Sequence, residues 1–188
     1  MRRTHLAVSM SLLIVCLALL PTVAGTAAKT PTIATLLPAS NELEGWAAVP
    51  KTLTYCANAK ELHKIYNGGD GEYIKAGVTE AVQQTYKNGS LLATVVVHKF
   101  GTDWQKSKAH YTRCQKAIST AKGYTTMPVK NAGCYSQTPG AQLVGYSWTG
   151  HYMARYEFYK LTTTSAMESF MKNVTGKCAR LLASKTAK

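Results

Sequence analysis

One short stretch of the sequence, residues 66–77, holds the side chains best placed to do chemistry. It reads Tyr-Asn-Gly-Gly-Asp-Gly-Glu-Tyr-Ile-Lys-Ala-Gly. Asn67, Asp70 and Glu72 offer three oxygen-bearing groups, which could hold Ca²⁺ loosely or serve as the carboxylates of a hydrolase. The spacing is not that of a calcium-binding loop, and no Lys-Ser or Lys-Thr follows the glycines as in a phosphate loop. We therefore expect no metal and no cofactor.

The same stretch has a purely structural interpretation. Asn67-Gly68-Gly69 supplies residues that accept the left-handed conformation in which many helices end. The stretch is thus a helix stop and turn first and a candidate ligand site second. The candidate ligand-binding residues are Trp46, Asn67, Gly68, Gly69, Asp70, Glu72 and Tyr73.

Nucleophilic catalysis finds little support in the sequence. No Gly-x-Ser-x-Gly is present, and we identify no catalytic residue. The cysteines beyond the leader are even in number, which favours two disulfides in an oxidising compartment. Pairing within sequence halves joins Cys56 with Cys114 and Cys134 with Cys178, and the main rival joins Cys114 with Cys134, which closes the shortest loop.

Aromatic residues are the remaining excess, with 11 tyrosines and 3 tryptophans against 3 phenylalanines. Several of them crowd residues 146–159. Such rings could stack on sugars or bases, or could be cross-strand pairs on a half-buried sheet.

The first 28 residues have the pattern of a secretory signal: two arginines, an apolar run from Leu6 to Leu20, Pro21 and then small residues. The run is shorter than the roughly 20 residues that span a bilayer. We predict cleavage at an undefined point near residue 28 and an extracytoplasmic location, periplasmic or secreted.

The chain is strongly basic, with a net charge of +13, of which Arg2 and Arg3 carry two, leaving +11 after cleavage. A basic exported protein is attracted to anionic lipids or polymers. Its lysines are scattered singly, however, as on an ordinary solvated surface. No specific nucleic-acid binding and no further transmembrane segment are expected.

The elements that must position these residues follow from periodicity. After a lead-in at 29–50, in which Trp46 buries its ring, we expect a short strand at 52–55 and a helix capped by Asn58 that runs to Tyr66. Strands are predicted at 79–87 and 91–100 around Asn88-Gly89, and at 142–148 and 152–161 around Thr149-Gly150. Helices with capping boxes start at Thr102-x-x-Gln105 and Ser165-x-x-Glu168.

A hairpin followed by a capped helix thus occurs twice, which predicts an internal duplication. The expected fold class is α+β: an antiparallel sheet built from two hairpin-plus-helix halves, with the helices packed on one face. We expect one domain at 51–183 and a disordered tail at 184–188.

The sequence resembles a family of exported bacterial proteins of unknown function whose hallmark is Tyr-Ile-Asn-Gly-Gly-Ala-Glu-x-Tyr. The resemblance rests on Leu37-Pro38, Gly45-Trp46, residues 64–77 and Thr149-Gly-His-Tyr152. Where the family has Ala-Glu, this chain has Asp70-Gly71. The resemblance implies location and fold but no activity.

The sequence therefore favours a non-enzymatic domain that binds an unidentified ligand or partner at the cell envelope. There are two alternatives. One is a hydrolase that uses Asp70 or Glu72, and the other is a basic binder of anionic polymers or lipid surfaces. Oligomeric state and ligand stay open.

Overall fold

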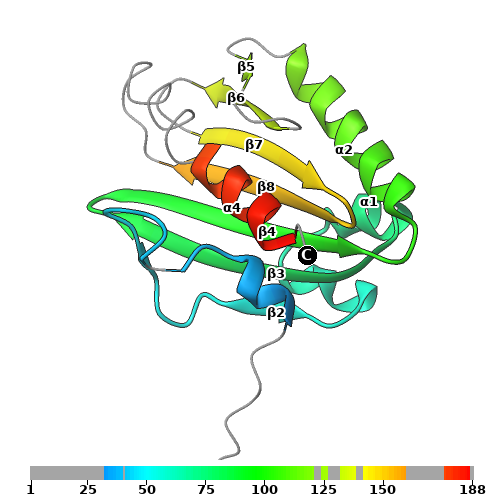
Figure 1. Cartoon of the computed structure of the whole chain (residues 1–188), viewed down its shortest axis with the longest axis horizontal. Coiled ribbons are helices and arrows are strands. Elements are labelled where there is room, and N and C mark those ends of the chain that lie inside the picture. The colour runs from blue at the N-terminus through cyan, green and yellow to red at the C-terminus, as the bar shows by residue number, and fades with distance from the viewer. Residues whose placement is uncertain are drawn as a thin grey trace, which may run out of the picture.

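The structure is a computed structural model that describes residues 32–39, 41–120, 124–126, 132–138, 142–159 and 176–186. The predicted signal peptide lies outside these residues. The described chain forms an antiparallel sheet with helices around it, which confirms the α+β class (Figure 1). No helix in these ranges is both long and apolar enough to span a bilayer.

The strands are β1 (Ala47–Ala48), β2 (Thr54–Cys56), β3 (Val78–Asn88), β4 (Leu91–Phe100), β5 (Tyr124–Thr126), β6 (Ala132–Thr138), β7 (Gln142–Thr149) and β8 (Tyr152–Tyr159). The helices are the 3₁₀ helices η1 (Thr32–Leu36) and η2 (Ala59–Lys64) and the α-helices α1 (Asp70–Lys75), α2 (Trp104–Ser119) and α4 (Gly176–Thr186). The sheet order is β1-β3-β4-β8-β7-β6-β5, and β2 also pairs with β3.

Both predicted hairpins form, each around a glycine with positive φ. Asn88 pairs with Leu91, so the turn residues are Gly89 and Ser90, one position later than Asn88-Gly89 predicts. Gly89 has φ 57° and Gly150 has φ 52°, and no other turn residue of either hairpin has positive φ. A glycine with positive φ at the first turn position is typical of a type II′ turn, whose twist suits a two-residue hairpin.

The two hairpins lie side by side through their second strands, and their register is symmetrical. Val95 of β4 pairs with Tyr156 of β8, and these residues stand equally far along the chain from Gly89 and Gly150. The pair therefore lies on an approximate twofold axis perpendicular to the sheet. Such an axis would place equivalent helices on the same face.

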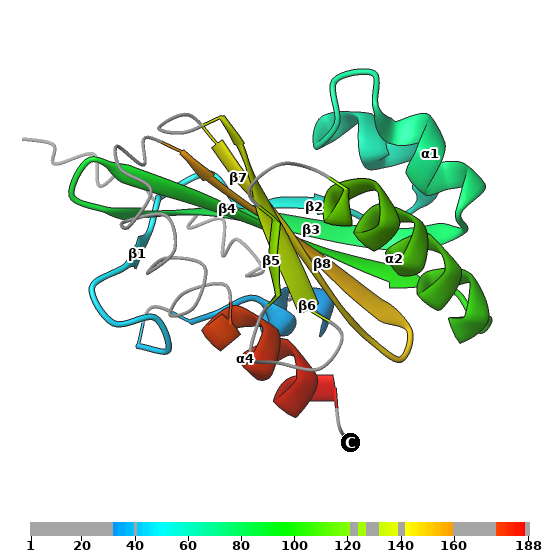
Figure 2. The same ribbon diagram turned by 90° about the horizontal axis from the view of Figure 1, so that it is seen from above.

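The helices lie on both faces of the sheet, so the prediction that they pack on one face is wrong (Figure 2). Leu182 of α4 packs with Val95, Val97 and Tyr156 on one face. Tyr111 and Cys114 of α2 pack with Val96 and Met153 on the other, which we call the α2 face. Local periodicity shows which side of a helix is apolar, but not which side of a sheet the helix crosses.

The lead-in 29–50 is part of the body wherever the structure describes it. Ile33, Leu36, Leu43 and Trp46 are buried in the core on the α4 face. The Trp46 ring meets Phe158 edge-on at a centroid distance of 6.3 Å.

The predicted disordered tail begins too early. Helix α4 continues to Thr186, and Lys185 Nζ donates to the Leu37 carbonyl at 2.9 Å and to Glu42 at 2.5 Å. Lys185 is therefore tied to the lead-in. The predicted capping box Ser165-x-x-Glu168 lies outside the described residues.

Helix α2 is capped by Asp103, the residue before its first turn, and not by the predicted Thr102 capping box. The Asp103 carboxylate accepts from the Gln105 N–H at 3.0 Å. Further along, Ser107 Oγ donates to the Gly150 carbonyl at 2.6 Å and accepts from Trp148 Nε1 at 2.8 Å. This bridge holds α2 against the second hairpin.

Cys56 and Cys114 are free thiols, so the predicted Cys56–Cys114 disulfide is absent. Each sulfur has its own partner: Cys56 Sγ donates to the Glu61 carbonyl at 3.1 Å, and Cys114 Sγ lies 3.7 Å from His110 Nε2. Both nonetheless belong to the core cluster on the α2 face. The side chains of Cys134 and Cys178 lie outside the described part of the structure.

Candidate functional site

A pocket opens on the α2 face where the turn after η2 meets the middle of the sheet. Its volume is about 270 Å³. Three of its residues, Gln83, Val96 and Arg155, stand side by side on β3, β4 and β8. The full lining is Ile65, Tyr66, Asn67, Gly69, Gln83, Val96, Arg155 and Glu157.

The wall opposite the sheet is positioned by helix caps. The Asn58 side chain accepts from the Lys60 N–H at 3.0 Å and starts η2, whose C-cap is Ile65. Gly68, with φ 84°, then reverses the chain, and α1 starts at Asp70. The turn therefore places Asn67 and Gly69 at the rim of the pocket, where both are exposed.

Three parallel rings anchor this wall to the sheet. Tyr73 of α1 stacks on Tyr66 at a centroid distance of 4.4 Å and on His98 of β4 at 4.6 Å. The Tyr66 hydroxyl is hydrogen-bonded to His98 Nε2, and His98 Nδ1 donates to the Met153 carbonyl at 3.2 Å. We call Tyr66, Tyr73 and His98 the ring column.

Arg155 and Glu157 form the charged part of the pocket. They follow each other on one face of β8, and their side chains form an ion pair. Arg155 Nη1 also lies 3.4 Å from the Tyr73 hydroxyl, and its guanidinium carbon lies 5.8 Å from the centre of the Tyr66 ring. Its Nε is buried and has no hydrogen-bond partner among the described residues.

The surroundings fix the protonation states of these groups. Burial lowers the pKa of His98 to about 3, so the imidazole is neutral at physiological pH. Burial raises the pKa of Tyr66 well above its usual value and keeps the phenol protonated. Burial disfavours the Arg155 charge, but Tyr73 and Glu157 outweigh it, and the pKa of Arg155 is raised. The pocket thus holds one fixed cation, one carboxylate and neutral rings.

Some of the residues predicted as a ligand site belong to this pocket and others lie away from it. Asn67 and Gly69 line the pocket, and Tyr73 supports it from within the core. Asp70 and Glu72 are not part of the lining; Glu72 pairs loosely with Arg113 at 3.4 Å and Lys75 at 3.7 Å. Trp46 lies in the core on the opposite face and has a structural role.

Sequence reasoning missed Gln83, Arg155 and Glu157, which complete the pocket. One signal was available. Arg155 and Glu157 lie two residues apart within a predicted strand, so both point to the same face. Two opposite charges on one face of a central strand indicate either a paired structural site or a ligand site.

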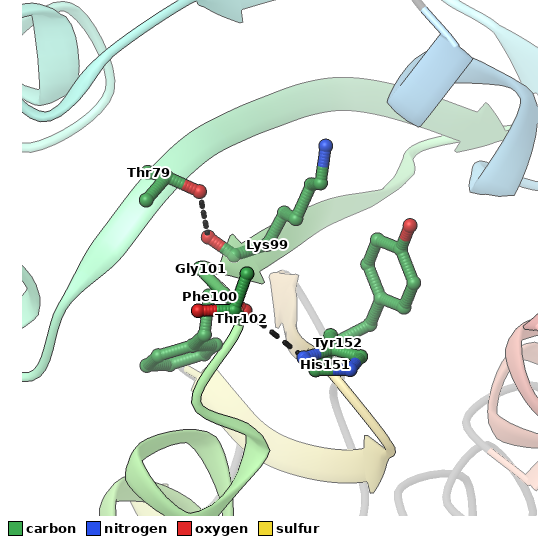
Figure 3. Close-up of a pocket in the computed structure, with 7 residues that line it drawn as sticks. All are labelled: Thr79, Lys99, Phe100, Gly101, Thr102, His151 and Tyr152. Atoms are coloured by element: carbon green, nitrogen blue, oxygen red, sulfur yellow. Dashed lines mark hydrogen bonds between the residues drawn. The ribbon is translucent and has the colours of Figure 1, made fainter.

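Two other hollows are lined by described residues. One, of about 540 Å³, lies where β4 meets the β7–β8 turn (Figure 3). There the Thr79 hydroxyl and His151 Nδ1 bond to the main-chain carbonyls of Lys99 and Gly101, and the Lys99 and His151 side chains point in different directions. The other, of about 630 Å³, is an open hollow along α2 that includes Lys108, Arg113 and Lys116. Neither gathers side chains of opposite charge.

No described group of three or more His, Cys, Asp or Glu side chains could hold a metal ion. His110 and Cys114 approach each other, but His110 Nδ1 accepts from Arg113 at 2.7 Å, and burial raises the pKa of the Cys114 thiol. A protonated, half-buried thiol is a poor nucleophile.

Comparison with known proteins supports the fold. No family model and no curated protein matches the sequence. Among solved structures, the chain is similar to the extracellular domain of PknH from Mycobacterium tuberculosis, with a TM-score of 0.52 and 12% identity over 81% of this chain and 93% of that one. At this identity the likeness concerns the fold, and the neighbour is an extracellular domain.

Proposed function

We propose that this protein is an exported, non-catalytic domain that binds a small ligand in the pocket between the Asn67–Gly69 turn and the sheet. The predicted signal peptide and the extracellular location of the PknH domain support export. The observation that carries ligand binding is the convergence in one pocket of the motif residues Asn67 and Gly69 with the Arg155–Glu157 pair of β8.

Unpaired polar groups strengthen this proposal. The buried Arg155 Nε has no hydrogen-bond partner in the described part of the chain. The carboxamides of Gln83, which is half-buried, and Asn67, which is exposed to solvent, make no hydrogen bond to other described residues. Buried donors without acceptors cost free energy. A bound ligand, with its ordered water, would supply the missing partners.

The absence of Asp70 and Glu72 from the lining argues for binding over hydrolysis. Paired carboxylates that act as acid and base must face one substrate. Glu72 instead points to Arg113 and Lys75 on the outside of α1.

Glycine positions allow a clean test. A Cβ at Gly69 or Gly71 meets no atom within 4 Å, so a side chain can start at either glycine without a clash. Because Gly69 lies at the rim of the pocket, Gly69→Trp should obstruct its entrance, whereas Gly71→Trp, two residues away and outside the lining, is the matched control.

The mature wild type and both variants are incubated with a small-molecule extract of the producing cell's envelope, and retained compounds are identified by mass spectrometry. A compound retained by wild type and Gly71→Trp but lost from Gly69→Trp supports the proposal. Retention that does not depend on Gly69, or none, overturns it. Chemical change of the retained compound over time would favour the hydrolase instead.

A second candidate function rests on the basic side of α2. Lys108, Arg113 and Lys116 line one hollow of this helix. A row of cations favours anionic lipids or polymers. Vesicles containing an anionic lipid should then bind at low salt and release the protein as salt rises, and Lys108→Glu with Lys116→Glu should abolish binding. No binding at low salt would exclude this function.

A further inference from the structure

The described side chains that line the pocket between Asn67 and Arg155 carry no net charge. Its ionised side chains are Arg155 and Glu157, and they neutralise each other. A bound anion would be attracted by Arg155 but repelled by Glu157. A bound cation would be attracted by Glu157 but repelled by Arg155. The pocket therefore favours a ligand that is neutral but rich in polar groups.

The remaining polar groups offer both halves of a hydrogen bond. Each carboxamide of Asn67 and Gln83 provides a donor and an acceptor, Arg155 provides donors, and Glu157 provides acceptors. Hydroxyl groups donate and accept at once, and adjacent hydroxyls match the planar, two-pronged ends of these side chains. A polyhydroxylated ligand can bond to donors and acceptors alike, whereas a carboxylate or phosphate only accepts.

The apolar lining and the size narrow the ligand further. Ile65 and Val96 supply a hydrophobic surface beside the polar groups. The faces of a sugar ring carry C–H groups that suit such a surface, while its hydroxyls project at the rim. A volume of about 270 Å³ lies below the roughly 300 to 1,000 Å³ of pockets for drug-sized ligands. It suits a single ring.

From these observations we infer that the pocket binds one neutral sugar residue, presented as a free glycoside or as the end of an envelope saccharide. This inference rests on the proposed ligand-binding function and names the chemical class of its ligand. The juxtaposition that carries it is the self-neutralised Arg155–Glu157 pair beside the unpaired carboxamides of Asn67 and Gln83.

The test uses defined probes on the mature chain. Saturation-transfer NMR is recorded with a panel of neutral methyl glycosides, and separately with succinate, inorganic phosphate and choline. We expect at least one glycoside to bind wild type and Gly71→Trp but not Gly69→Trp, with an affinity that stays the same as salt rises. Gln83→Leu should weaken that binding by about 3- to 10-fold, the effect of one net hydrogen bond.

Other results separate this inference from the function on which it rests. Gly69-dependent binding of succinate, phosphate or choline without any glycoside would overturn the neutral-sugar inference but leave ligand binding in place. No Gly69-dependent signal from any glycoside also overturns the inference, and the extract experiment then decides the proposed function by itself. Glycoside binding that persists in Gly69→Trp would place a sugar site elsewhere and overturn this one.

Discussion

The Tyr66 hydroxyl is hydrogen-bonded to Nε2 of His98, and together with the stacking of Tyr73 on His98 this bond ties the turn that forms the pocket rim to the central strand β4. Because His98 Nδ1 donates to the Met153 carbonyl, Nε2 is the acceptor and the Tyr66 hydroxyl is the donor. The neutral, fully buried imidazole is thus a structural link between the candidate site and the sheet.

We predict that Tyr66→Phe lowers the free energy of unfolding by about 1 to 3 kcal/mol, because it leaves His98 Nε2 buried without a donor. Urea denaturation of the two proteins gives the difference. Tyr55→Phe is the matched control, since the Tyr55 hydroxyl bonds to Glu80 at 3.2 Å in a half-buried setting and its loss should cost less. Equal losses would mean that the Tyr66–His98 bond adds nothing special.

The stability should fall as the solution becomes acidic. Burial lowers the pKa of His98 to about 3 and that of His110 to about 4, both from an ordinary value of 6.5. Between these values and pH 6.5 the unfolded chain binds protons that the folded chain does not, so stability is retained above pH 6.5 and lost as the pH falls. Each histidine contributes a slope of up to about 1.4 kcal/mol per pH unit.

His110→Gln tests this assignment. The variant keeps a polar group near Arg113, which bonds to His110 Nδ1, and removes one of the two titrations. Unfolding free energies measured from pH 7 to pH 4.5 should fall less steeply in the variant. Parallel curves would show that His110 does not cause the acid sensitivity.

The periodic parts of this fold could be predicted from the sequence, and so could the turn residues Asn67 and Gly69 of the site, whereas the sheet residues that complete the site could not. The strand patterns along 79–100 and 142–161 predict both hairpins, and Asn58 predicts the start of η2, because these signals are local. Asn67 and Arg155 meet in one pocket only because the turn between η2 and α1 lies over strands β3, β4 and β8. That depends on the stacking of Tyr73 on His98, a contact between a short helix and a strand that no local pattern encodes.

The helix placement illustrates the same limit. The repeated hairpin-and-helix pattern predicts equivalent positions for α2 and α4, and the registers of the hairpins fit a twofold axis. The helices nevertheless cover opposite faces, where α4 packs with the lead-in and α2 packs beside the ring column. Tertiary contacts with η1 and α1 therefore decide the faces, and the duplication itself stays a prediction.

Three neighbouring glycines should respond differently to alanine. Gly68 has φ 84°, so Gly68→Ala should cost about 1 to 2 kcal/mol. Gly69 has φ −98° and open space around it, so its alanine variant should lose less. Gly71 lies inside α1, where alanine should gain up to about 1 kcal/mol. Denaturant midpoints of the three variants give this order, and a different order would contradict the turn geometry.

Trp46 should matter for stability and not for ligand binding. It is 5% exposed and packs on Phe158 in the core on the α4 face, away from the pocket. We expect Trp46→Ala to cost about 3 to 5 kcal/mol and Trp46→Phe to cost less. Trp46→Phe should bind pocket ligands as the wild type does, and a folded Trp46→Phe protein with impaired binding would return Trp46 to the site.

Glu72 provides the sharpest distinction between binding and hydrolysis. Its side chain is 61% exposed, and its pairs with Lys75 and Arg113 at 3.7 and 3.4 Å are worth at most about 1 kcal/mol. Glu72→Gln should therefore unfold at nearly the same denaturant concentration as the wild type and retain the same small molecule from the envelope extract. Asp70→Asn should behave alike, because neither carboxylate lines the pocket. Were either variant to retain the ligand but stop a slow conversion seen with the wild type, the chemistry would belong to that carboxylate and the protein would be a hydrolase.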